Sequence, residues 1–110
     1  MEWGKVLTAI DSAREGLDER AHQMRARAYE GVNEPNKAIE AYRKALSIHP
    51  HSPGLCLGLG AVQRMVGHVA PAKRSFQTAL KYDPQDGRIL NNLGAARSAQ
   101  GDLKQAITLF

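Results

Sequence analysis

Apolar residues recur along the chain at the spacing of helix faces, in stretches separated by short polar turns. The clearest stripe is Ala38, Ile39, Tyr42, Ala45 and Leu46, which stand at positions i, i+1, i+4, i+7 and i+8. Such spacing is typical of the buried face of an amphipathic helix. Read in this way along its whole length, the sequence predicts helices over residues 2–15, 19–30, 35–48, 53–66 and 69–82, and from about residue 88 onward.

The turns between these helices carry their own signals. Asn33 tolerates a left-handed backbone conformation, and Ser52 followed by Pro53 fits an N-cap and a first helical position. Gly67 is expected to close the helix that begins at Pro53. Gly101 is expected to end another helix in the same way, with a capping box over residues 102–105 starting the next one.

The chain repeats itself at an offset of 34 residues. One set of matches pairs Ala38, Ala45, Leu46 and Pro50 with Ala72, Ala79, Leu80 and Pro84. A second, independent set pairs Leu59, Gly60, Ala61, Gly67 and Ala72 with Leu93, Gly94, Ala95, Gly101 and Ala106. A fixed period of this size indicates stacked structural repeats.

These residues resemble the tetratricopeptide repeat, a helix–turn–helix unit of 34 residues. The stretch 53–86 carries the pattern best, with Cys56, Leu59, Gly60, Gln63, Gly67, Ala72, Phe76, Ala79 and Pro84 at its positions. The resemblance implies an all-α fold, a right-handed α-α superhelix (solenoid) of antiparallel helix pairs. The expected repeats are 19–52, 53–86 and 87–110, the third truncated within its second helix. Residues 1–17 would form an N-terminal helix that is either a partial repeat or a cap.

Similarity to the family also implies that the first helix of each pair lines a concave groove. Its residues are expected to be Arg20, Gln23, Met24, Arg27, Leu57, Ala61, Arg64, Met65, Arg88, Asn91, Asn92 and Ala95. Four arginines against a single acid, Glu30, make this surface basic, and methionines give it an adaptable apolar floor. Arginine side chains can hold carboxylates in two-point hydrogen bonds. We therefore expect a scaffold that binds a peptide or helix of a partner protein with acidic and apolar residues.

Some members of the family hold acidic C-terminal tails of chaperones with a clamp of Lys and Asn side chains. This sequence departs from that pattern, because Gln23 and Arg27 stand where the clamp has Lys and Asn, and Gly58 replaces another Asn. Arg88 is a fair chemical match and Asn92 a weaker one. The alternative to a binding groove is a surface that is merely solvated, or filled by a missing part of the chain.

Composition and charge narrow the other function classes. The net charge is +4 with 24% charged residues, and no basic run with interleaved aromatics accompanies it, so the pattern does not favour nucleic acid. A related 35-residue RNA-binding repeat has the wrong period. Neither a catalytic constellation nor a Cys/His cluster with metal spacing is present, so we expect no enzyme activity and no cofactor. Without a membrane span or a signal sequence we expect a cytoplasmic protein, or a periplasmic one if a signal was removed.

The last residues predict a second class of function. Leu103, Ala106, Ile107 and Phe110 place an apolar stripe on a helix of about nine residues, which is marginal alone. We expect either self-association through this end, making a homo-oligomer by end-to-end packing or helix exchange, or fraying of residues 102–110. The identity of a partner is not in the sequence, because the repeat serves many pathways.

Overall fold

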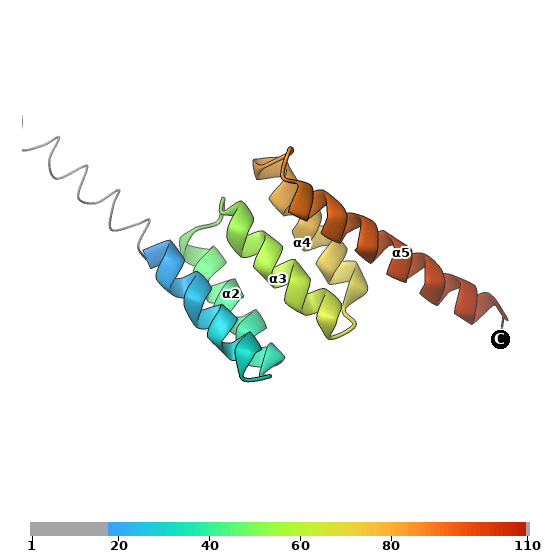
Figure 1. Cartoon of the computed structure of the whole chain (residues 1–110), viewed down its shortest axis with the longest axis horizontal. Helices are drawn as coiled ribbons and strands as arrows, with labels where there is room; N and C mark the ends of the chain where they lie inside the picture. Colours follow the sequence, from blue (N-terminus) through green and yellow to red (C-terminus); the bar gives the residue numbers. More distant parts are fainter. Residues whose placement is uncertain (1–17, 110) are drawn as a thin grey trace, which may run out of the picture.

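The computed structural model describes the backbone of residues 18–109 and the side chains of residues 18–101. A helix covers residues 18–31, and the helices α2 (Pro35–Ile48), α3 (Pro53–Met65), α4 (Val69–Tyr82) and α5 (Gly87–Leu109) follow. Helix 18–31, α3 and α5 form one layer, and α2 and α4 form a second layer behind it (Figure 1). The described part of the chain contains no strand. The all-α helical repeat fold is therefore confirmed, whereas the helix predicted over residues 2–15 lies outside the described residues.

The turns follow the predicted chemistry. Asn33 has φ 60° and Gly67 has φ 87°, so both take the left-handed conformation that ends a helix. The hydroxyl of Ser52 accepts a hydrogen bond from the backbone N–H of Leu55 at 3.2 Å. Pro53 takes the first position of α3, where its missing N–H leaves no intrahelical bond unmade.

The largest fully buried side chains belong to Tyr42, Phe76, Leu55, Ile89 and Val62. The Tyr42 ring belongs to a core shared by helix 18–31, α2 and α3. Phe76 packs with Ala72 of its own helix and with Leu93 and Ala96 of α5. Each aromatic ring therefore joins one helix pair to the next, and because an isolated pair would leave this surface exposed, stability arises between neighbours.

The glycines of α3 serve a different purpose from the predicted one. The sequence suggested that they let helix backbones approach closely, but a Cβ added at Gly58 would lie 2.5 Å from Cζ of Tyr42. A Cβ at Gly60 would lie 2.6 Å from Cε1 of Phe76. The missing side chains thus make room for two aromatic rings, and the cost in helix propensity, roughly 1 kcal/mol per glycine, is offset by their burial.

Gln63 occupies a buried position where the family pattern places a tyrosine. It is only 4% exposed, and its Oε1 accepts a hydrogen bond of 2.6 Å from the hydroxyl of Ser75 on α4. A buried amide without a partner would be destabilising, so Ser75 accounts for the tolerance of this substitution.

The expected break at Gly101 is wrong. Helix α5 runs without interruption from Gly87 to Leu109, whereas the equivalent residue one repeat earlier, Gly67, turns the chain with a positive φ. A glycine only permits such a turn, and the turn at Gly67 is held by α4 packing back onto α3. No helix among the described residues is long and apolar enough to cross a membrane.

Candidate functional site

The residues expected to line the groove all lie on helix 18–31, α3 and α5, and none of them is buried. The exposed ones are Arg20, Met24, Arg27, Arg64, Met65, Arg88, Asn91 and Ala95. The half-buried ones are Gln23, Leu57, Ala61 and Asn92. These three helices make up one layer (Figure 1), and a Cβ added at Gly54 of α3 would lie 3.4 Å from Nε2 of Gln23, so the first two are in direct contact.

A polar cluster formed by Arg27, Glu30 and Tyr42 lies where helix 18–31, α2 and α3 meet; we call it the Tyr42 cluster. The Tyr42 hydroxyl donates a hydrogen bond of 3.1 Å to Oε2 of Glu30, and Arg27 also lies beside this hydroxyl. Tyr42 reaches this place from the rear layer because Gly58 leaves space for its ring. Burial and the neighbouring Glu30 carboxylate raise the pKa of Tyr42 to about 12, so it remains a neutral hydrogen-bond donor at physiological pH.

At the other end of the layer, Arg88 is already engaged. Its Nη2 lies 2.9 Å from Oδ2 of Asp86 and its Nε lies 3.3 Å from Oδ1 of the same carboxylate. This two-point contact with Arg88 lowers the pKa of Asp86 below its usual range. The side-chain amide of Asn92 donates to the carbonyl oxygen of Arg88 at 2.8 Å. Both residues that match the Lys/Asn clamp therefore make contacts within α5 and the turn before it.

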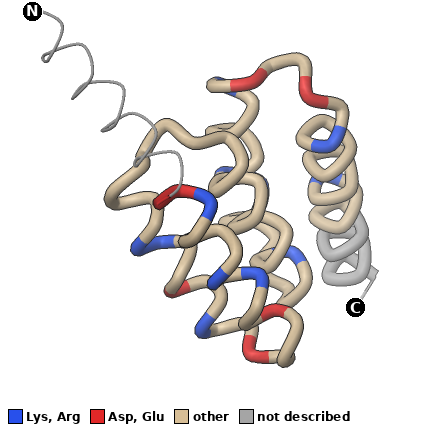
Figure 2. The backbone as a smooth tube through the Cα atoms, turned by 60° about the vertical axis from the view of Figure 1, so that its left-hand side comes forward, with Lys and Arg blue, Asp and Glu red and all other residues tan. Residues whose placement is uncertain are grey.

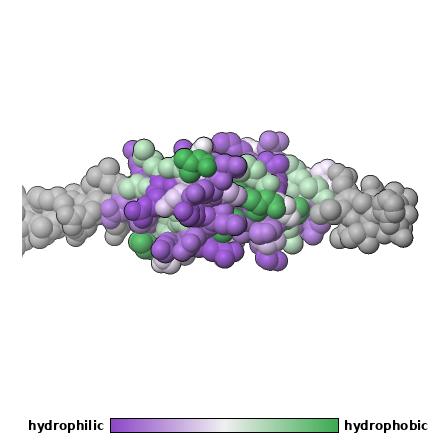
Figure 3. All heavy atoms as spheres, turned by 90° about the horizontal axis from the view of Figure 1, so that it is seen from below, coloured by the Kyte–Doolittle hydropathy of each residue, from purple (hydrophilic) through white to green (hydrophobic). Residues whose placement is uncertain are grey.

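The basic character of the surface consequently rests on fewer arginines than the sequence count suggests. Among the ion pairs between described residues, none includes Arg20 or Arg64. Arg64 is followed by Met65, which is 66% exposed, and Met24 on helix 18–31 is 69% exposed. Basic residues are spread over both layers (Figure 2), and a largely hydrophilic surface with a few apolar patches is visible from below (Figure 3).

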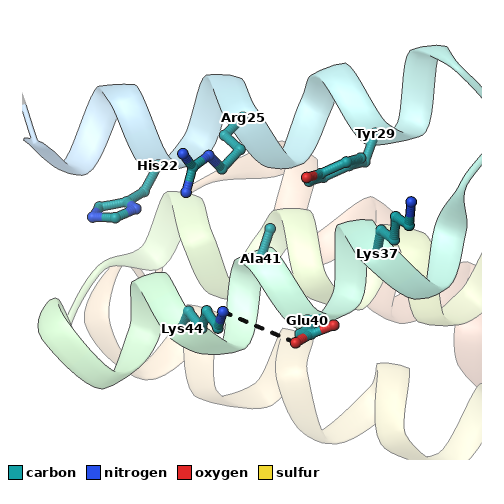
Figure 4. A pocket seen from close by; sticks show the side chains of 7 residues that line it. All are labelled: His22, Arg25, Tyr29, Lys37, Glu40, Ala41 and Lys44. Carbon is teal, nitrogen blue, oxygen red and sulfur yellow. Dashed lines mark ion pairs between the residues drawn. The ribbon is translucent and has the colours of Figure 1, made fainter.

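The best-formed hollow lies elsewhere, between helix 18–31 and α2, and has a volume of about 240 Å³. Figure 4 shows its lining side chains, with the Lys44–Glu40 ion pair at 4.0 Å on one wall. The residues that line it are His22, Arg25, Tyr29, Lys37, Glu40, Ala41 and Lys44. None of the predicted groove residues belongs to this set.

A second hollow has the same construction one repeat later. Each of the seven positions above, moved on by 34 residues, lines the hollow between α3 and α4, where Arg43 and Leu46 of α2 complete the wall. The first hollow is therefore a packing surface of the repeat, seen without the helix that would precede it. It is not a site with chemistry of its own.

The residues predicted for self-association fall outside what the structure describes. Leu103, Ala106 and Ile107 lie on α5, but their side chains are not described, and Phe110 is not described at all. Sequence reasoning missed two described residues of α5 that bear on this question. Leu90 is 49% exposed, and a Cβ added at Gly94 would meet nothing within 4 Å. The 34-residue period could have identified both, since they follow Cys56 and Gly60 at that distance.

Metal chemistry has no support within the described range. No group of three or more His, Cys, Asp or Glu residues in that part of the chain could hold a metal ion. Cys56 is 4% exposed, and burial raises the pKa of its thiol. A buried thiol with a raised pKa is a poor nucleophile.

The fold and the repeat period define an all-α helical repeat protein whose helices are paired and stacked. Two family models, both described as tetratricopeptide repeat, match residues 19–62 and 75–108. Together they span most of the chain, which belongs to the tetratricopeptide repeat family.

Similar proteins of known sequence are much longer than this chain. Small glutamine-rich tetratricopeptide repeat-containing protein 2 of Mycosarcoma maydis is 28% identical over 93 residues, which make up 83% of this chain and 26% of that protein. The general transcriptional corepressor ssn6 of Schizosaccharomyces pombe is 30% identical over 94 residues, or 86% of this chain and 8% of that protein. The chain thus spans about a quarter or less of the length of these relatives.

Two solved structures share the fold. The second tetratricopeptide repeat domain of Spaghetti (RPAP3), bound to the HSP90 peptide SRMEEVD, has a TM-score of 0.76 at 15% identity, covering 89% of this chain and 91% of that one. The first such domain of the same protein, bound to the same peptide, has a TM-score of 0.74 at 20% identity, covering 82% and 73%. At these identities the likeness concerns the fold.

Proposed function

We propose that this chain is a protein-interaction scaffold whose front layer, made of helix 18–31, α3 and α5, binds an acidic and apolar segment of a partner protein. The observation that carries the proposal is the exposure of Met24 and Met65, at 69% and 66%, on helices that also present Arg20 and Arg64. Large apolar side chains gathered with charged ones on one surface are typical of interaction sites. Methionine adapts its shape to a partner, and arginine recognises carboxylates.

The solved neighbours support the general class of ligand. Their titles state that they bind an HSP90 peptide, SRMEEVD, which is itself acidic and carries one methionine. The recognition chemistry proposed for this chain differs from a Lys/Asn clamp, because Arg88 is bound to Asp86 and Asn92 to the backbone of its own helix. We infer that the charge available to a partner is concentrated on Arg20, Arg27 and Arg64.

The test begins with a partner found by affinity capture and mapped to one segment with overlapping peptides. The affinity of this segment is then measured by fluorescence anisotropy for the Arg27→Glu and Arg64→Glu variants. Each charge reversal should weaken binding by about tenfold, which corresponds to about 1.4 kcal/mol. The difference should shrink as salt is added, since the charges are exposed.

A matched control is Arg43→Glu, which makes the same change of charge on α2, in the rear layer. Arg43 is exposed and lines the hollow between α3 and α4. It should leave the affinity within about twofold of the wild type, because a distant exposed charge is largely screened. Equal affinities for the two front-layer variants and the wild type would exclude this surface.

The peptide SRMEEVD serves as a comparison ligand. Since the clamp positions of this chain are altered or already engaged, we expect it to bind at least about tenfold more weakly than the mapped segment. Tighter binding of SRMEEVD than of any mapped segment would mean that a clamp forms despite Gly58 and the Asp86–Arg88 pair.

A second candidate function is self-assembly through α5. The observation in its favour is the exposure of Leu90 together with the open space over Gly94. The corresponding residues of α3, Cys56 and Gly60, are both buried. A helix face that is covered in one repeat and open in the next offers a surface for a second copy of the chain.

A further inference from the structure

The face of α5 that contains Leu90 and Gly94 has the shape of a helix-packing site. One repeat earlier, Cys56 is buried in a cluster with Ala79 of α4, and the ring of Phe76 fills the space over Gly60. On α5 the same positions are open: Leu90 is 49% exposed, and nothing described lies within 4 Å of a Cβ at Gly94. This face therefore resembles the surface of α3 as it would be without α4.

The chain does not cover this face with its own next segment. At Gly67 it turns back with φ 87° so that α4 packs against α3, but α5 continues straight through Gly101 to Leu109. Figure 1 shows α5 extending past the end of α4 as a single rod. In this arrangement the backbone after Gly101 runs along the helix axis, away from Leu90 and Gly94.

The sequence after Gly101 nevertheless has the chemistry of the missing cover. Ala106 and Phe110 follow Ala72 and Phe76 by 34 residues, and Phe76 is the residue that fills the space over Gly60. We propose that residues 102–110 of a second copy of this chain pack on the Leu90–Gly94 face, so that two copies exchange these segments. This proposal specifies the mode of the self-assembly proposed above and rests on it.

The repeat also fixes the symmetry of the exchange. Gly60 and Phe76 lie equally far along the sequence from residue 68, and Gly94 and Phe110 lie equally far from residue 102. Paired helices within a repeat are antiparallel, so an exchanged pair consists of two antiparallel α5 helices related by a two-fold axis near residue 102. Both copies give and receive the same segment, which makes the interface closed and limits the assembly to a dimer.

The experiment is sedimentation equilibrium of the 110-residue chain over a series of concentrations, with circular dichroism as a check of folding. The wild type should pass from monomer to dimer. Gly94→Leu fills the space that Phe110 of the other copy would take, and Phe110→Ala removes the occupant. Each variant alone should raise the dimer dissociation constant at least about tenfold while leaving the helix content of the monomer unchanged.

Mixing the two variants gives the sharpest result. In a mixed dimer, the side chain introduced by Gly94→Leu faces the vacancy made by Phe110→Ala, and the other interface is wild type. An equimolar mixture should therefore dimerise within a few-fold of the wild type, although neither variant does so alone. The control variant Ser98→Leu adds the same side chain at an exposed position of α5 whose equivalent in α3, Arg64, is also exposed, and it should not change the dissociation constant.

The possible failures are distinguishable. A wild type that remains monomeric at every concentration would overturn both the exchange and the self-assembly, and would indicate that the segment folds back in its own chain or that another protein covers the face. A wild type that dimerises no more tightly than either variant, with no gain on mixing, would overturn the exchange alone. Association would then use another surface.

Discussion

Gly60 and Gly94 occupy the same place in consecutive repeats but have different surroundings, and this difference makes a stringent test of the packing. A Cβ added at Gly60 would lie 2.6, 2.7 and 3.0 Å from Cε1, Cδ1 and Cζ of Phe76, whereas a Cβ added at Gly94 would meet nothing within 4 Å. We therefore compare Gly60→Ala with Gly94→Ala. The two substitutions are chemically identical, and both lie inside a helix.

The expected magnitudes follow from two opposing effects. Replacing glycine by alanine within a helix stabilises it by about 1 kcal/mol at either position. Overpacking of a well-filled core costs about 1–3 kcal/mol, and this applies only at Gly60, because Phe76 is fully buried and packed against Leu93 and Ala96. Gly94→Ala should thus gain about 1 kcal/mol, while Gly60→Ala should range from neutral to a loss of about 2 kcal/mol.

The assay is urea unfolding followed by circular dichroism, at a protein concentration low enough to keep self-association negligible. The helix-propensity gain cancels in the difference between the two variants, so Gly94→Ala should be more stable than Gly60→Ala by about 1–3 kcal/mol. In a domain of this size, a change of about 1 kcal/mol moves the melting temperature by roughly 4–8 °C. Equal midpoints for the two variants, or a higher midpoint for Gly60→Ala, would refute the packing of Phe76 over α3.

Three further predictions concern single side chains. Because burial and Glu30 raise the pKa of Tyr42 to about 12, while an unfolded chain releases this proton near pH 10 (roughly), stability should fall as pH rises from 10 toward 12, and Tyr42→Phe should flatten that fall in alkaline unfolding curves. The buried Cys56 thiol, whose pKa burial raises, should react with a thiol reagent only slowly until denaturant is added; rapid labelling of the folded protein would contradict its burial. Ser52→Ala removes the cap of α3 and should lower the free energy of unfolding by about 1 kcal/mol, whereas an unchanged melting temperature would show that the cap contributes nothing.

The repeat period accounts for most of what the sequence predicted correctly. It placed the helices from Pro35 to Tyr82 and their turns, because stacked repeats impose the same local rules at each step, as the left-handed Asn33 and Gly67 illustrate. It failed at Gly101. The local sequence there is as permissive of a turn as at Gly67, but a turn is retained only where the following helix packs back.

The electrostatics of the candidate site depended on contacts that the period does not encode. Counting first-helix positions missed Asp86, which precedes α5 and binds Arg88 at 2.9 Å. Nor could the pattern indicate that Gly58 admits the ring of Tyr42, since a glycine can equally accommodate a backbone. Both features depend on the direction of a side chain from a neighbouring element, which is settled only in three dimensions.

The sequence of contacts between helices has a consequence for the dynamics of the chain. Among α2 to α5, α2 contacts only α3, α4 contacts α3 and α5, and α3 contacts all three others. Loss of α2 or of α5 therefore leaves α3 packed on its remaining neighbours, so local opening should begin at the ends and reach α3 last. Amide protons of α3 should exchange with solvent most slowly. A ligand that spans the front layer would couple the opening of its two ends through this central helix.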